Sequence, residues 1–186
     1  MAAPLRSLWV AHGSQTISTE TPIDRREYRH TIGLFATGVT VIAAGQADYL
    51  HVMTANAVTS LSLDPLLLLF CVGKEARMAA HLGEHPAFSV NILRSHQADL
   101  SPYFAGLWKD EEPPHFEMIP WHGTARLDGC LASVCCELHE MVEGGDHWIV
   151  IGKAIDVWLG QEPADPLVFF GGDYRALDLT PPDSLA

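Results

Sequence analysis

Small and hydroxyl-bearing residues gather in the first half of the stretch VMTANAVTSLSLDPLLLLFCVG, which runs from Val52 to Gly73. Such residues can offer hydrogen bonds to a ligand without filling the space beside it. After the Asp64-Pro65 turn, the segment 66–72 is apolar throughout, which indicates a buried strand. The stretch therefore predicts a thin polar ledge held against a rigid strand, with ledge members Thr54, Ala55, Asn56, Ala57, Thr59 and Ser60.

A second candidate for chemistry is the segment Gly145-Asp146-His147, which lies between two long strand-like runs. Histidine changes its charge near neutral pH, and a hairpin tip can carry such a ring over a neighbouring site. The same residues also suit a plain turn, with His147 as the first residue of the next strand. The residues alone leave both interpretations open.

The motifs of standard phosphate loops and zinc helices are missing. The segment from Gly33 to Gly38 lacks the lysine and hydroxyl residue of a phosphate-binding loop, and no G-x-G-x-x-G motif follows an expected strand. His139 and His147 are spaced too widely for an H-E-x-x-H zinc helix. We therefore expect no metal site, and a nucleotide would bind without either standard loop.

The composition argues for one acidic globular domain. The 186 residues are 48% hydrophobic, and a formal net charge of -12 disfavours nucleic acid or an anionic membrane surface as partner. No segment suits a signal peptide or a membrane span, so we expect a cytoplasmic protein. The four cysteines lie in apolar runs without metal-ligand spacing, which favours reduced thiols in the core.

The order of elements follows from periodicity and from helix and turn signals. Helices are expected at 21–36, with Thr21 as N-cap, at 75–82, and at 95–104, where Pro102 kinks or divides the helix. Strands are expected at 39–44, from Tyr49 into the ledge, and at 66–72, 88–93, 131–141, 147–159 and 167–170. Residues 108–115 are expected as loop, residues 1–20 as an arm, 21–178 as one domain and 179–186 as a tail.

Six or seven strands joined mostly by hairpins favour a closed antiparallel barrel. The crossover helices that repeated β-α-β units would need are missing from the sequence. Alternation in the segment 131–141 places Ala132, Val134 and Cys136 on one face and Ser133 and Cys135 on the other. The sequence thus predicts a mainly β fold with a few short helices.

Six segments in a fixed order carry a family resemblance: FATGVTVIAA (35–44), MTANAVTSLSLDP (53–65), FSVNIL (88–93), FAG (104–106), GGDHWIVIG (144–152) and PLVFFGGDYRAL (166–177). In this series the chain resembles the flavin reductase-like family, the small reductase components of two-component flavin-dependent monooxygenases. The resemblance covers roughly residues 25–177. It implies an antiparallel Greek-key split β-barrel, a homodimer, reduction of FMN or FAD by NADH or NADPH, and delivery of reduced flavin to a partner oxygenase.

The resemblance also implies how a flavin is held. A flavin ring has apolar faces and one polar edge, so the ledge would supply donors along that edge and the strand 66–72 would back it. His147 would be the catalytic residue, because Gly145-Asp146-His147 matches the family segment associated with the nicotinamide nucleotide. The remaining residues that the resemblance assigns to the pocket are Thr37, Gly38, Val39, Cys71, Val72, Gly73, Lys74, Arg77, Phe88, Asn91, Phe104 and Tyr174.

One departure keeps other functions open. Family members often carry a Ser or Thr shortly after the strand 66–72, where this chain has Glu75-Ala76. Glu75 would oppose a phosphate, so the expected contact of Lys74 and Arg77 with the flavin phosphate is weakened. The sequence therefore does not decide whether the flavin is FMN or FAD. The alternatives are a non-catalytic flavin carrier or sensor, and a split-barrel oxidoreductase with a tightly bound flavin. The Gly145-Asp146-His147 segment favours the reductase, because a carrier needs no nicotinamide contact.

Overall fold

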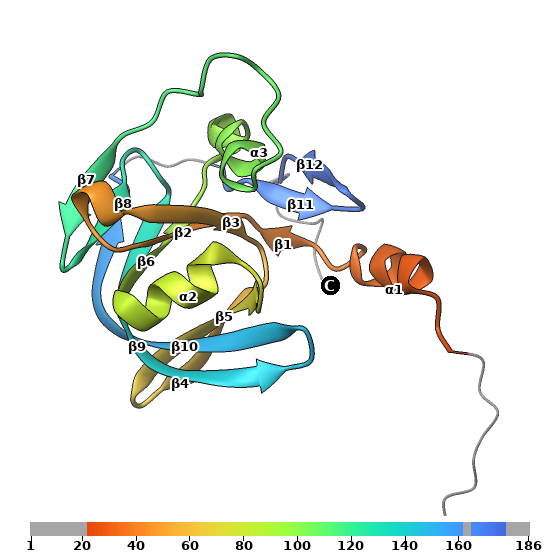
Figure 1. Ribbon diagram of the computed structural model, residues 1–186. Helices are drawn as coiled ribbons and strands as arrows, with labels where there is room; N and C mark the ends of the chain where they lie inside the picture. The colour runs from red at the N-terminus through yellow and green to blue at the C-terminus, as the bar shows by residue number, and fades with distance from the viewer. Residues whose placement is uncertain (1–21, 162–164, 178–186) are drawn as a thin grey trace, which may run out of the picture.

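The computed structural model describes residues 22–161 and 165–177 and shows a mainly β protein in which every strand pair is antiparallel (Figure 1). The strands are β1 Thr37–Gly38, β2 Thr40–Ala44, β3 His51–Ala55, β4 Val58–Leu63, β5 Leu66–Gly73, β6 Ala87–Ile92, β7 Met118–Trp121, β8 Thr124–Leu127, β9 Ala132–Gly144, β10 His147–Leu159, β11 Val168–Phe170 and β12 Asp173–Arg175. The helices are α1 Arg25–Ile32, α2 Arg77–Glu84 and α3 Leu100–Phe104, with 3-10 turns η1 Ala47–Tyr49 and η2 Ser95–Gln97. Within the described ranges, no helix is long and apolar enough to cross a bilayer.

The main sheet has seven strands in the order β3-β2-β6-β9-β10-β5-β4. Strands β3 and β4 stand at its two ends, yet only Asn56 and Ala57 separate them along the chain. A two-residue link cannot span a flat sheet of seven strands spaced about 4.8 Å apart, so the sheet has to curl until its ends meet. This curl confirms the antiparallel split barrel expected from the sequence.

Buried apolar side chains form two clusters. The larger one contains Phe70, Phe88 and Val150 together with Met78 and Leu82 of α2, all fully buried. The smaller one joins α3 and β11 to the barrel and consists of Val39, Val41, Leu93, Leu100, Leu127, Cys130 and Leu167. Strand β2 is buried along its whole length and lies between the two clusters, because Ile42 and Ala44 enter the larger one while Val41 enters the smaller one.

The first helix differs from its prediction at both ends. It begins at Arg25, where the side chain of Asp24 accepts a hydrogen bond from the backbone N–H of Arg26 at 2.9 Å, and not after Thr21, which lies outside the described residues. It ends at Ile32, because the chain turns at Gly33, whose N–H bonds to the Arg29 carbonyl. The expected helix to residue 36 is therefore too long.

Other elements follow the prediction with shifted bounds. The expected helix 95–104 divides into η2 and α3, and Pro102 lies in the first turn of α3, where its missing N–H leaves no intrahelical bond unmade. The strands around Gly145 are confirmed, but β9 extends to Gly144, so the turn has only two residues. The strand expected from Tyr49 into the ledge is β3, which begins at His51 and ends at Ala55, and the rest of the ledge continues across Asn56-Ala57 into β4.

Candidate functional site

An open cleft lies beside the ledge and has two connected parts. One part has a volume of about 680 Å³ and the other of about 650 Å³, and both are lined by Phe35, Thr37, Asn56, Val58 and Thr59. The first part also has an apolar floor from Leu66, Leu67, Leu68, Val90, Ile92, Val134, Ala154 and Val157. We call these two parts together the ledge cleft. A volume of several hundred Å³ with few polar groups is typical of a site for a flat organic ligand.

The polar side of the ledge cleft is exposed. Asn56, Ala57, Thr59 and Ser60 are all exposed, and three of them line the cleft with side chains that carry hydrogen-bonding groups. The Asn56 amide donates to the Thr37 hydroxyl at 3.3 Å, which joins the ledge to β1 across the cleft. This polar row faces an apolar floor, as a ring with apolar faces and a polar edge requires.

Gly38 leaves room at the edge of the ledge cleft. A Cβ built on Gly38 would meet no other described atom within 4 Å, and its φ is not in the left-handed region. Neither the backbone conformation nor packing within the chain therefore explains a glycine here. The glycine leaves the backbone of β1 bare at the edge of the cleft, so that a ligand in the cleft has access to it.

The Gly145-Asp146-His147 segment forms the tip of the β9–β10 hairpin. Gly145 has φ +68°, which suits a turn with glycine as its first central residue. His147 Nδ1 lies 2.7 Å from Asp146 Oδ1, and this hydrogen bond, followed by the charge of His147, lowers the pKa of the Asp146 carboxyl. His147 pairs with Gly73 of β5, so the predicted segments 71–74 and 145–147 lie side by side.

A further cavity of about 630 Å³ separates this tip from α1, which stands away from the barrel on the same side (Figure 1). We call it the α1 cavity; its lining consists of Ile23, Arg25, Tyr28, Arg29, Asp146 and His147. Arg29 also lines the ledge cleft, so it stands between the two spaces. Arg25 and Arg29 were not among the predicted site residues, because only their four-residue spacing marked them and no local signal places α1 beside the tip.

The side chains of several predicted residues do not line the ledge cleft. Phe88 is fully buried in the larger cluster, with its ring 5.4 Å from that of Phe70. Asn91 is also fully buried: its amide oxygen accepts from the Leu127 N–H at 2.9 Å and the Ser133 hydroxyl at 2.8 Å. Its amide nitrogen donates to the Val41 carbonyl and to Ser89. Both residues belong to the core, and we remove them from the predicted site.

Five more of the predicted residues make contacts within the fold or lie in its core. The Thr54 hydroxyl donates to the Ser101 carbonyl at 2.7 Å and so faces α3. Val39 uses its N–H and its carbonyl to bind Leu167 and Leu93. Val72 lies in the larger apolar cluster, and Phe104 packs against the smaller one. Ala55 is likewise buried, so the part of the ledge that faces the cleft begins at Asn56.

The basic residues expected at a phosphate lie elsewhere. Lys74 Nζ lies 3.3 Å from Glu143 Oε1 and 5.2 Å from the centre of the Trp148 ring, so its charge is engaged by the hairpin. Arg77 begins α2 and acts on His51, whose pKa it helps to lower. Tyr174 packs with Phe169 at 5.7 Å between ring centres, and of these two only Phe169 lines the cleft.

The cysteines divide into three buried thiols and one at the cleft. Burial raises the pKa of Cys135 to about 11 and that of Cys136 to about 12, and it also raises the pKa of Cys130. A thiol held protonated in this way is a poor nucleophile. Cys71 differs from the expected core thiol, because it is half-buried and lines the ledge cleft.

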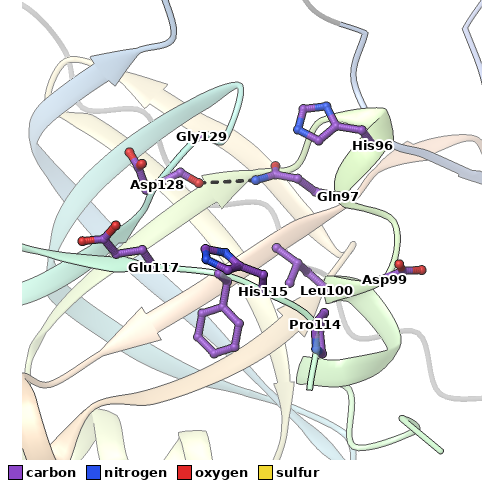
Figure 2. A pocket seen from close by; sticks show the side chains of 10 residues that line it. His96, Gln97, Asp99, Leu100, Pro114, His115, Glu117, Asp128 and Gly129 are labelled. Carbon is purple, nitrogen blue, oxygen red and sulfur yellow. Dashed lines mark hydrogen bonds between the residues drawn. The ribbon is translucent and has the colours of Figure 1, made fainter. Parts of the chain in front are cut away.

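Another cavity, of about 370 Å³, lies between η2, α3 and the segment 114–117 (Figure 2). Its lining is rich in imidazole and carboxylate groups, which include His96, His115, Glu117 and Asp128, and Figure 2 shows Gln97 bonded to the Asp128 carbonyl. None of the predicted site residues lines it. In residues 22–161 and 165–177, no group of three His, Cys, Asp or Glu is arranged to hold a metal ion.

The chain is similar to a known protein family, to curated proteins and to solved structures. Residues 32–178 match the flavin reductase like domain family. The chain is 38% identical over 153 residues to the reductase component of 4-hydroxyphenylacetate 3-monooxygenase from Thermus thermophilus, over 82% of this chain and 97% of the relative. It is 36% identical over 161 residues to the NADH-dependent FAD reductase of Streptomyces globisporus, over 83% and 86% of the two chains. The solved flavin reductase PheA2 superposes with a TM-score of 0.78 at 37% identity, over 84% and 99% of the two chains.

The chain therefore belongs to the flavin reductase-like family, which confirms the resemblance seen in the sequence. It is a flavin reductase, and so an oxidoreductase. The ledge cleft fits a flavin on its own geometry, since it combines an apolar floor, an exposed polar row and a strand edge left bare by Gly38.

Proposed function

We propose that the protein reduces FMN or FAD with NADH or NADPH and releases the reduced flavin to a separate oxygenase. The observation that carries this proposal is the open ledge cleft, in which Asn56, Thr59 and Ser60 face an apolar floor. The names of the relatives support it, since one is an NADH-dependent FAD reductase and another is the reductase component of a monooxygenase. A cleft that is open to solvent also suits a flavin that leaves after reduction.

The residues of the ledge cleft act by holding and orienting the ligands. A bound flavin supplies a ring that takes up a hydride, and this chemistry requires no nucleophile from the protein. Asn56, Thr59 and Ser60 would hold the polar edge of the ring, while Leu67 and Val134 would contact a face. His147 at the hairpin tip would orient the nicotinamide nucleotide from the neighbouring α1 cavity.

The test is a reduction assay with four cofactor pairs. Purified protein is mixed with NADH or NADPH and with free FMN or FAD, and the visible absorbance of the flavin is followed under anaerobic conditions. The proposal expects bleaching with at least one pair, and no bleaching with any pair rejects it. Gel filtration of the flavin-loaded protein separates the alternatives, because retention of the flavin without oxidation of nicotinamide would indicate a carrier.

We also propose that the protein is a homodimer. Helix α1 has no buried residue, and its apolar side chains Tyr28 and Ile32 are exposed, as are Ile23 before the helix and Phe35 after it, the latter at 72% exposure. Leu63, Leu66, Val157 and Leu159 are exposed on the strands. An isolated chain would leave these apolar groups in water, and a second copy would cover them. Light scattering should then give twice the chain mass of 20.3 kDa, and a monomer would contradict the proposal.

We place the protein in the cytoplasm. The support for this location is that its four cysteines are all free thiols, three of them buried. Free thiols are typical of a reducing compartment such as the cytosol. Fractionation of cells followed by immunodetection would check this location.

A further inference from the structure

The cavity in Figure 2, between η2, α3 and the segment 114–117, is separate from the ledge cleft and from the α1 cavity. We call it the η2 cavity; its volume is about 370 Å³. It shares no lining residue with the other two sites, and it is lined by none of the apolar side chains that we expect a second copy to cover. A ligand in the η2 cavity would therefore leave both the flavin site and the proposed dimer surface accessible.

Hydrogen bonds between distant segments hold the walls of the η2 cavity. The Gln97 side chain accepts from the Arg94 N–H at 3.0 Å and donates to the Asp128 carbonyl at 3.4 Å, so η2 is joined to the end of β8. The Asp128 N–H donates to the Glu117 carbonyl at 2.9 Å, which joins the segment 114–117 to the same point. The walls are thus preformed, and a ligand loses little affinity to ordering them.

One wall of the η2 cavity is apolar. Leu100 is 4% exposed, and Pro114 and Phe116 line the cavity beside it. The Phe116 ring is fixed by packing against Phe104 and Tyr103, with ring centres 4.9 and 5.6 Å away. This wall suits the hydrocarbon part of a small ligand, and an aromatic ring also attracts a cation placed over its face.

The polar groups of the η2 cavity are mainly hydrogen-bond acceptors. They are the carboxylates of Asp99, Glu117 and Asp128, the imidazoles of His96 and His115, and the Gln97 amide, whose nitrogen already donates to Asp128. Asp128 has a cation near it, since Arg126 Nη1 lies 3.7 Å from its Oδ1. Asp99 and Glu117 form no ion pair with any residue that the structure describes. Acceptors with unbalanced negative charge call for a ligand that donates hydrogen bonds and is positive.

The carboxylates lie on both sides of the cavity. Figure 2 shows those of Glu117 and Asp128 on one side of the His115 ring and that of Asp99 on the other. A cation beside His115 therefore lies between negative charges. A metal ion does not suit this place, because no group of three His, Cys, Asp or Glu in the described ranges is arranged to hold one. An ammonium group does, since it carries three donors on a single positive charge.

We propose that the η2 cavity binds a small organic ammonium ion, with its hydrocarbon part against Leu100 and Phe116 and its ammonium group beside His115. The inference goes beyond the proposed function, because it assigns a further ligand to a cavity that neither the flavin nor the nicotinamide nucleotide uses. A volume of about 370 Å³ limits the ligand to a small amine, such as one with a single ring and a short chain.

Three probes of similar size test the charge of the ligand. Binding of phenethylamine, 2-phenylethanol and phenylacetate to the purified protein is measured by calorimetry. Phenethylamine should bind at least about tenfold more tightly than the neutral alcohol and the anionic acid, because only the amine is attracted by the carboxylates. Absence of phenethylamine binding, or equal affinity for the amine and the alcohol, would overturn the inference.

Variants test the position of the amine. Asp99→Asn/Glu117→Gln removes two charges from the η2 cavity, and Asp110→Asn/Glu111→Gln removes two from a neighbouring loop that does not line it. The first variant should bind phenethylamine about tenfold more weakly and the second as tightly as the wild type. Thermal melting checks that both fold. Equal affinity in the two variants would contradict the proposed position.

Saturation with FMN separates the η2 cavity from the ledge cleft. The affinity for phenethylamine should stay within about twofold when FMN is present, because the two spaces share no lining residue. Displacement of the amine by FMN would place it in the ledge cleft and overturn the inference. The flavin reduction assay needs no amine, so failure of this inference leaves the proposed function standing.

Discussion

The backbone N–H of Lys74 donates a hydrogen bond to the carbonyl oxygen of Asp146, with nitrogen and oxygen 3.0 Å apart. This bond continues the pairing of β5 with β10 beyond Gly73 and His147. Strand β5 pairs on its other side with β4, which carries the exposed part of the ledge. One strand therefore positions both the ledge cleft and the hairpin tip.

The side chain of Lys74 is predicted to stabilise the hairpin and not to bind flavin phosphate. Lys74→Met should leave the Michaelis constant for flavin within about twofold and lower the free energy of unfolding by at most about 1 kcal/mol, because a partly exposed ion pair contributes little. Steady-state kinetics and urea denaturation measure the two effects. Glu143→Gln serves as the matched variant. A tenfold rise in the Michaelis constant for flavin in Lys74→Met, but not in Glu143→Gln, would show that Lys74 does contact the flavin phosphate.

Gly38 is predicted to be needed for flavin and not for folding. Gly38→Val should weaken flavin binding by about tenfold or more, because the added side chain projects into space that packing leaves open. The melting temperature should stay close to that of the wild type. Fluorescence titration with FMN and FAD measures affinity, and Gly83→Ala, at an open glycine in α2, is the control. Undiminished affinity in Gly38→Val would show that the ligand lies elsewhere.

Gly152 is predicted to be required by the core. A Cβ at this position would collide with the ring of Phe88 and lie 2.9 Å from the Cβ of Cys136. Gly152→Ala should therefore lower the free energy of unfolding by about 1–3 kcal/mol, as overpacked cores do. Urea denaturation measures the loss. Adding Phe88→Leu should recover part of it by removing the colliding ring, and two additive losses would refute the steric explanation.

Acid is predicted to destabilise the contact between α2 and the β2–β3 hairpin. Burial, then the charges of Arg77 and His81, lowers the pKa of His51 below its ordinary value of 6.5. The folded state disfavours the charged imidazole, so the contribution of His51 to stability is complete above the unfolded pKa of 6.5 and is lost as the pH falls through the lower folded pKa.

This acid effect is measured by comparing urea midpoints at about pH 7.5 and about pH 5. His51→Gln should reduce the difference between the two midpoints. The rings of His81 and His85 lie 4.4 Å apart, so His85→Gln is the variant that tests the rest of the cluster. An unchanged pH dependence in His51→Gln would assign the acid sensitivity to other groups.

Local sequence was sufficient to predict those elements whose structure depends on a few neighbouring residues. Alternation and β-branched residues predicted β2, β9 and β10, and a glycine-rich turn marked the hairpin that carries His147, because these signals act over a few neighbouring residues. The ordered segments also identified the family. The break at Asn56-Ala57 was missed because nothing local requires it, and it exists only where the curled sheet brings β3 and β4 together.

The site itself depended on contacts across the chain. Asn91 resembles a ledge residue in type, but Val41, Leu127 and Ser133 surround it and satisfy its amide within the core. Arg29 gave no chemical signal on its own, and it lines both candidate cavities because α1 stands beside the hairpin tip. The sequence by itself determined most strands of the main sheet, the turn between β9 and β10, and the family. The tertiary structure decided which polar groups face a ligand, because burial and charge depend on neighbours that are distant in sequence.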